Sequence, residues 1–166
     1  MADGDINGGV VTFAVCPVPA LIQVNAEFAI HGRVEISGAG HIFLRANNNN
    51  RFFTVESGAV LTLTQVILQN GRATTNGGAV SVLDGGALAT RGAVLFNNRV
   101  TGIANGGAIS AFNAKVALVN TTLLSNTSES YGGGMYVYGG NLLLQNAQIR
   151  TNRGNNTGGV HARGAE

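Results

Sequence analysis

A chain of 166 residues is long enough for one domain with a buried core, and 45% hydrophobic against only 11% charged residues excludes an intrinsically disordered chain. The net charge of +2 comes from 10 basic and 8 acidic residues that are scattered along the sequence, so we expect no nucleic-acid partner. The apolar runs are too short to span a bilayer and no signal sequence opens the chain, so we expect no membrane insertion by this segment.

The first part of the chain, residues 1–52, alternates apolar and polar residues without a regular period. We expect one or two irregular opening coils here, with "RANNNNR" at 45–51 as a solvated loop. Cys16 stands alone, which favours a buried thiol, although pairing with a cysteine outside this chain is the alternative. The alternating apolar pairs are Ile22 and Val24, Val34 and Ile36, and Ile42 and Leu44.

From residue 53 to residue 166 the sequence repeats. "NGGAVSVLDGGALATRGAVLFNN" at 76–98 returns as "NGGAISAFNAKVALVNTTLLSN" at 105–126 and as "YGGGMYVYGGNLLLQNAQIRTN" at 131–152. One apolar column recurs at spacings of 27, 28 and 26 residues, and such periods are typical of stacked repeats. Its members are Leu61, Leu88, Val116 and Leu142.

Within each repeat the apolar residues are spaced by two, which is the period of a strand. The glycine density opposes helices, since each Gly costs a helix about 1 kcal/mol. We therefore predict an all-β chain folded as a single-stranded parallel β-helix, or solenoid, of about six coils with roughly 26–29 residues each. We expect one domain over residues 1–166, in which the last coil is incomplete.

Asparagines occupy equivalent turns of successive repeats. Asn tolerates a positive φ, and its amide can bond to its own copy in the next coil. We predict one ladder through Asn98, Asn126 and Asn152, with Gly71 in the first repeat, and a second through Asn120 and Asn146.

The order "VTFAVC", "VEISGAG", "RFFTVESGAVLTLTQVILQNGRA" and then repeated "GGAI" and "LxLxN" units resembles secreted bacterial right-handed β-helix proteins. It is also similar to the polymorphic outer membrane proteins and to autotransporter-like adhesins with GGA-[IV] repeats. The resemblance covers nearly the whole chain and implies a right-handed coil. It also implies that the chain is part of a large surface or secreted protein, hence an extracellular or cell-surface location.

The sequence contains few groups that could catalyse a reaction. Glu56 and Asp84, near equivalent turns one coil apart, are the closest approach to a pair of catalytic carboxylates. His31, His41 and His161 are isolated, so we expect no metal site, and no motif indicates a cofactor.

One outward face of the predicted sheet carries aromatic side chains. If Met135 and Val137 point inward, a strip of outward residues runs over three coils, with Ser110 beside it. Aromatic side chains on a flat sheet suit stacking against sugar rings or burial under a partner, whereas stacking that only stabilises the sheet is the alternative. The candidate residues of this surface are Phe112, Tyr136, Tyr138, His161 and Arg163.

Three functions fit these observations. The leading hypothesis is a non-catalytic structural or adhesion module, a rigid rod with a glycan or protein partner on a host or neighbouring cell surface. The first alternative is a carbohydrate-active enzyme, a polysaccharide lyase or glycoside hydrolase, that would use Glu56 and Asp84. The second alternative is a rod that self-associates end to end through its open strand edges.

Overall fold

The computed structural model describes residues 5–13 and 19–166, so Cys16 lies outside the described part of the chain. The described residues form seventeen strands and no helix. The strands are β1 (Asp5–Thr12), β2 (Ala20–Val24), β3 (Phe28–Ala46), β4 (Phe53–Val55), β5 (Val60–Gln69), β6 (Arg72–Ala73), β7 (Val80–Val82), β8 (Ala87–Arg91), β9 (Val94–Phe96), β10 (Arg99–Val100), β11 (Ile109–Val119), β12 (Thr122–Leu124), β13 (Thr127–Ser128), β14 (Met135–Gln145), β15 (Gln148–Arg150), β16 (Arg153–Gly154) and β17 (Val160–Arg163).

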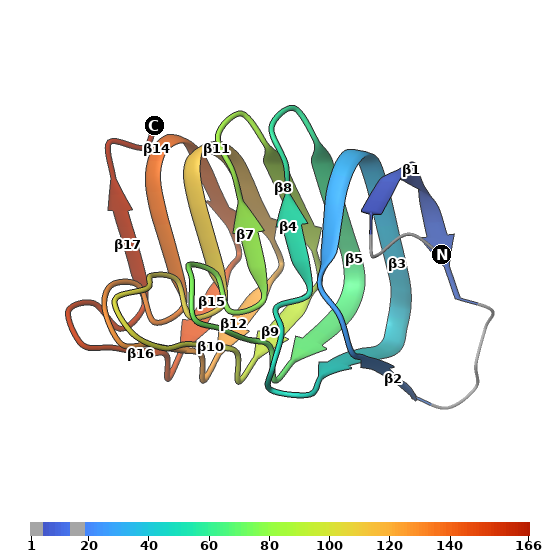
Figure 1. Ribbon diagram of the computed structural model, residues 1–166, viewed down its shortest axis with the longest axis horizontal. Helices are drawn as coiled ribbons and strands as arrows, with labels where there is room; N and C mark the ends of the chain where they lie inside the picture. The colour runs from blue at the N-terminus through green and yellow to red at the C-terminus, as the bar shows by residue number, and fades with distance from the viewer. Residues whose placement is uncertain (1–4, 14–18) are drawn as a thin grey trace.

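The strands are stacked as the sequence repeat predicts. The chain winds along the long axis of the molecule from β1 at one end to β17 at the other (Figure 1). Each coil pairs in parallel with its neighbours; for example, β11 pairs with β14 over ten residues and with β8 over five. The fold is therefore the predicted right-handed parallel β-helix of about six coils.

Each regular coil has three sides. The first side carries β4, β7, the start of β11, the start of β14 and β17, and we call it the short-strand side. The second side carries β5, β8 and the later halves of β11 and β14, and it continues into β9, β12 and β15. The third side is a separate four-stranded sheet in the order β16-β13-β10-β6. The loops from the third side back to the first project beside the short strands (Figure 1).

The predicted apolar columns form the core of the helix. Leu61 and Leu88 are in register, Leu88 and Val116 are in register, and all three are at most 3% exposed. The column two residues later contains one polar residue, Thr90, which is fully buried. Its hydroxyl lies 2.9 Å from that of buried Thr121, so the polar group is satisfied inside the core.

Both predicted asparagine ladders are confirmed. Asn98 Nδ2 donates to Asn126 Oδ1 at 3.0 Å, and Asn126 Nδ2 donates to Asn152 Oδ1 at 2.9 Å. Gly71 begins this buried ladder, because its amide donates to Asn98 Oδ1 at 2.8 Å. The second ladder is exposed and consists of Asn146 Nδ2 donating to Asn120 Oδ1 at 3.2 Å.

The double glycines let neighbouring coils approach closely where each loop enters the short-strand side. Gly106 has a φ of 73°, which favours glycine. At Gly107 a Cβ would lie 2.0 Å from the carbonyl oxygen of Gly133 in the next coil. Side chains are therefore excluded at this corner by the neighbouring backbone.

The opening coils are less regular than the later ones. The single strand β3 continues through two corners, whereas β5, β11 and β14 each continue through one, and the register of β3 against β5 shifts between Ser37 and Ile42. The apolar pairs predicted here still point inward, since Val34, Ile36, Ile42 and Leu44 are at most 6% exposed. The irregularity thus changes the turns of these coils and leaves their core intact.

Candidate functional site

The outer face of the short-strand side carries two columns of side chains. In the first column Ser110, Tyr136 and His161 are in register, and in the second Phe112, Tyr138 and Arg163 are in register. The structure therefore brings together the five residues that the sequence analysis placed on this surface.

The aromatic rings of these columns form one cluster. Phe112 lies 5.6 Å from Tyr136 and 6.2 Å from Tyr138, measured between ring centroids. The rings of Tyr136 and His161 lie 5.4 Å apart and only 4° from parallel, which is a stacked arrangement. The cluster follows the coil axis because parallel register repeats every side-chain position at about 4.8 Å.

A fifth ring, Tyr131, joins this cluster from the loop between β13 and β14. Its centroid lies 4.7 Å from that of His161, and the residue is 40% exposed. Its amide donates to Asn105 Oδ1 at 3.1 Å, so the loop is fixed to the coil before it. The repeat pattern did not predict Tyr131 as a member of this surface. The one available signal is its position before a double glycine, where the two preceding repeats have Asn76 and Asn105.

We call these five residues the aromatic strip: Phe112, Tyr131, Tyr136, Tyr138 and His161. Its most exposed rings are Tyr138, at 43%, and Tyr131, at 40%. The imidazole of His161 is held by a contact of 3.2 Å between its Nδ1 atom and the Thr157 hydroxyl. The strip thus offers exposed ring faces that are held in place by their neighbours.

Small side chains replace the rings toward the N-terminus of the same surface. Thr54 and Ser81 stand in the first column, and beside Phe112 they line a shallow hollow bounded by Thr75 and Asn76. Ser110 was expected on the exposed strip, but it is fully buried and its hydroxyl has no hydrogen-bond partner among the described residues. Although its column faces outward, the short side chain of Ser110 is covered because the larger Tyr136 lies beside it.

The two acidic residues considered for catalysis are not in one column. Val55 is in register with Val82, which aligns Glu56 with Leu83 and Asp84 with Ser57. Glu56 and Asp84 therefore differ by one residue in register on adjacent coils. Among residues 5–13 and 19–166, no group of three or more His, Cys, Asp or Glu side chains is placed to hold a metal ion.

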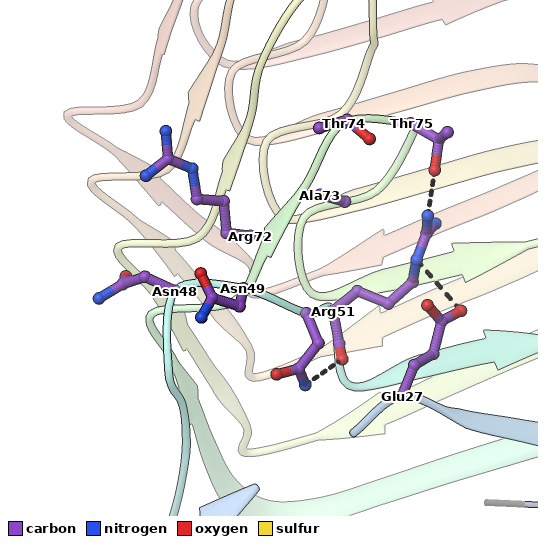
Figure 2. Close-up of a pocket in the computed structure, with 9 residues that line it drawn as sticks. Glu27, Asn48, Asn49, Arg51, Arg72, Ala73, Thr74 and Thr75 are labelled. Atoms are coloured by element: carbon purple, nitrogen blue, oxygen red, sulfur yellow. Dashed lines mark hydrogen bonds and ion pairs between the residues drawn. The ribbon is translucent and has the colours of Figure 1, made fainter. Parts of the chain in front are cut away.

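A polar pocket of about 330 Å³ lies farther toward the N-terminus, between the loop 48–51 and the segment 72–75. Figure 2 shows Asn48, Asn49 and Arg72 along one side of it and Arg51 with Thr75 along the other. The "RANNNNR" segment, expected only as a solvated loop, supplies part of the wall. We call this site the arginine pocket.

Comparisons with known proteins do not place the chain in a family. No family model and no solved structure matches it. A stretch of 43 residues, 26% of this chain, is 42% identical to part of the metabotropic glutamate receptor-like protein P of Dictyostelium discoideum, and the stretch spans 3% of that protein. In the described part of the chain, no helix has the length and apolar character needed to cross a membrane. The chain is thus similar to a small part of that receptor-like protein, and its fold and surfaces are the basis for a functional proposal.

Proposed function

We propose that this chain is a rigid, non-catalytic β-helical module of an exported bacterial surface protein, and that it binds a glycan on its aromatic strip. The resemblance of its GGA-[IV] repeats to polymorphic outer membrane proteins and autotransporter-like adhesins supports the exported, cell-surface location. The solenoid supports the rigid role, because each coil is held to the next by continuous parallel pairing.

One observation carries the glycan proposal: exposed aromatic rings lie side by side on a flat, regular face. Tyr138 and Tyr131 expose about two fifths of their surface instead of being buried in a core. Rings with an apolar face and a polar hydroxyl suit ligands that are themselves apolar on one face and polar at the edge, as sugar rings are. Phe112 on the coil before and His161 on the coil after extend this cluster of tyrosine rings over three coils, which suits an extended chain of sugars.

A glycan panel that measures binding and newly formed reducing or unsaturated ends in the same wells tests this proposal. We expect binding without new ends, and a loss of about tenfold in affinity for Tyr138→Ala, which removes an anchor ring. Tyr138→Phe keeps the ring and should bind nearly as well. Leu143→Ala is a matched control, because Leu143 is 53% exposed on the same strand but on another side of the coil.

Other outcomes would reject the proposal. New reducing or unsaturated ends would favour the enzyme alternative and direct substitutions to Glu56 and Asp84. If no glycan of the panel binds, or if Tyr138→Ala leaves binding unchanged, the aromatic strip is not a glycan site. A protein partner would then become the leading candidate for this face.

End-to-end self-association is a second candidate function, favoured by the uncovered apolar surface of the last coil. Leu118 is fully buried, whereas Leu144, its register partner in the next coil, is 40% exposed. A second copy stacked on this end would cover Leu144 and pair the open edges of β15 and β17. Analytical ultracentrifugation tests the idea: concentration-dependent growth that Leu144→Lys abolishes supports it, and a monomer at all concentrations rejects it.

A further inference from the structure

The arginine pocket contains two arginines in different situations. Arg51 is largely buried, with 11% of its side chain exposed, and its Nε lies 3.2 Å from Glu27 Oε1. One of its terminal nitrogens donates to the Thr75 hydroxyl (Figure 2), and the other donates to the Asn76 carbonyl. The hydrogen bonds and charge of Arg51 are therefore used to build the wall of the pocket.

Arg72, by contrast, has its charge available. It is exposed, and among the described residues no carboxylate forms an ion pair with it. It stands in register with Arg99 on the next coil, at about 4.8 Å. Like charges directly opposite each other destabilise a sheet, so this pair is unfavourable unless an anion lies near.

Two carboxylates near this pair are already engaged: Glu27, which also lines the pocket, pairs with Arg51, and Glu129 pairs with Arg99. Glu129 accepts a hydrogen bond from the Gly102 amide at 2.7 Å, and its other oxygen lies 2.7 Å from Arg99 Nη2. The Gly102 amide, then Arg99 and, more weakly, the charge of Arg72 hold the pKa of the Glu129 carboxyl below its ordinary value, so this carboxyl is ionised at neutral pH. Glu129 thus forms a direct ion pair with Arg99, whereas Arg72 acts on Glu129 only through its more distant charge and forms no ion pair of its own among the described residues.

The same pocket also contains an oxygen atom that lacks a hydrogen-bond donor. Asn50 donates from Nδ2 to the Arg51 carbonyl at 2.8 Å, but its Oδ1 atom is buried and accepts no hydrogen bond from the described residues. A buried acceptor without a donor is costly, and such groups are commonly satisfied by water or a ligand. The pocket therefore combines an arginine that forms no ion pair, Arg72, with an oxygen that lacks a hydrogen-bond donor among the described residues, Asn50 Oδ1.

We propose that the arginine pocket binds an acidic sugar unit, whose carboxylate or sulfate pairs with Arg72 and whose hydroxyls donate to the pocket's free acceptors. A guanidinium binds such anions through two parallel hydrogen bonds. The amides of Asn48 and Asn49 add donors and acceptors for further hydroxyls. This inference rests on the proposed function in taking a glycan as ligand, and it deepens that function by assigning the glycan a negative charge.

The test compares three hexasaccharides by isothermal titration calorimetry: an α-1,4-linked galacturonate, its methyl ester, which is neutral, and a sulfated hexasaccharide from heparin. We expect at least one acidic probe to bind tenfold or more tightly than the ester, and its affinity to fall with added NaCl. Arg72→Gln should abolish this preference and Arg72→Lys should keep part of it. Arg91→Gln, which removes an exposed charge from another side of the coil, should leave it unchanged. The tighter of the two acidic probes identifies the anion.

Two results would overturn the inference: an ester that binds as tightly as the acidic probes, or an acid preference that survives Arg72→Gln. Failure of both acidic probes to bind would overturn it as well. The proposed function has a separate test: if the aromatic strip binds the glycan, Tyr138→Ala must weaken the binding of the neutral and the acidic probes alike. A chain that binds neutral glycans through the aromatic strip without preferring acids would keep that function and lose this inference.

Discussion

The buried asparagine ladder should be among the largest single contributions to the stability of this fold. Asn126 Oδ1 accepts from the amide and the Nδ2 of Asn98 at 2.9 and 3.0 Å, and Asn126 Nδ2 donates to Leu95 O and Asn152 Oδ1, both at 2.9 Å. Asn126→Ala removes all four bonds. It leaves the buried Asn98 amide without its acceptor, which costs about 1–3 kcal/mol, and each remaining bond adds about 1 kcal/mol. We expect the free energy of unfolding to fall by about 4–6 kcal/mol.

Urea unfolding followed by circular dichroism measures this loss, and the exposed ladder provides the control. Asn120→Gly removes the single exposed bond with Asn146 and keeps a residue that accepts the φ of 49° at this position. It should cost less than about 1 kcal/mol. A loss of less than about 1 kcal/mol for Asn126→Ala, or equal losses for the two variants, would refute the reasoning.

Two further predictions concern polar groups. Thr90→Val should change the free energy of unfolding by less than about 1 kcal/mol, because Thr121 keeps its bond to the Val119 carbonyl. Thr121→Val leaves the buried Thr90 hydroxyl without a partner and should cost about 1–3 kcal/mol. Equal effects of the two substitutions in urea unfolding would contradict this asymmetry. The Glu129 carboxyl, whose pKa is lowered in the folded state, should stabilise the fold above its ordinary pKa and lose this contribution as pH falls through the lowered value. An NMR titration of Glu129 with unfolding curves of Glu129→Gln checks both statements, and a folded pKa at or above the ordinary value would contradict them.

The sequence predicts the coil and its ladders well, because a β-helix converts sequence period directly into spatial register. Leu61 and Leu88 are spaced by one period and become neighbours. Asn98 and Asn126 are related in the same way, and they hydrogen-bond. The aromatic columns follow by the same reasoning, since Tyr136 stands one period before a residue of β17, His161.

Features that depend on the loops could not be predicted in this way. Tyr131 replaces an asparagine at its position in the repeat, and only the folded loop brings its ring to His161. Arg72 and Arg99 were taken as scattered charges, although they directly follow Gly71 and Asn98, which the sequence repeat aligns; the repeat thus predicts their register, but it does not show that the loop 48–51 lies beside them. The arginine pocket lies between the loop 48–51 and the segment 72–75, and the period of the repeat does not encode how these two loops pack against each other.

NMR mapping tests most directly whether the aromatic strip binds a glycan. The best-bound oligosaccharide of the panel is titrated into labelled protein while the ring and backbone signals are followed. We expect the largest shifts at Tyr131, Tyr136 and Tyr138, with smaller shifts at His161. Shifts confined to other sides of the coil, with these rings unchanged at saturation, would contradict it.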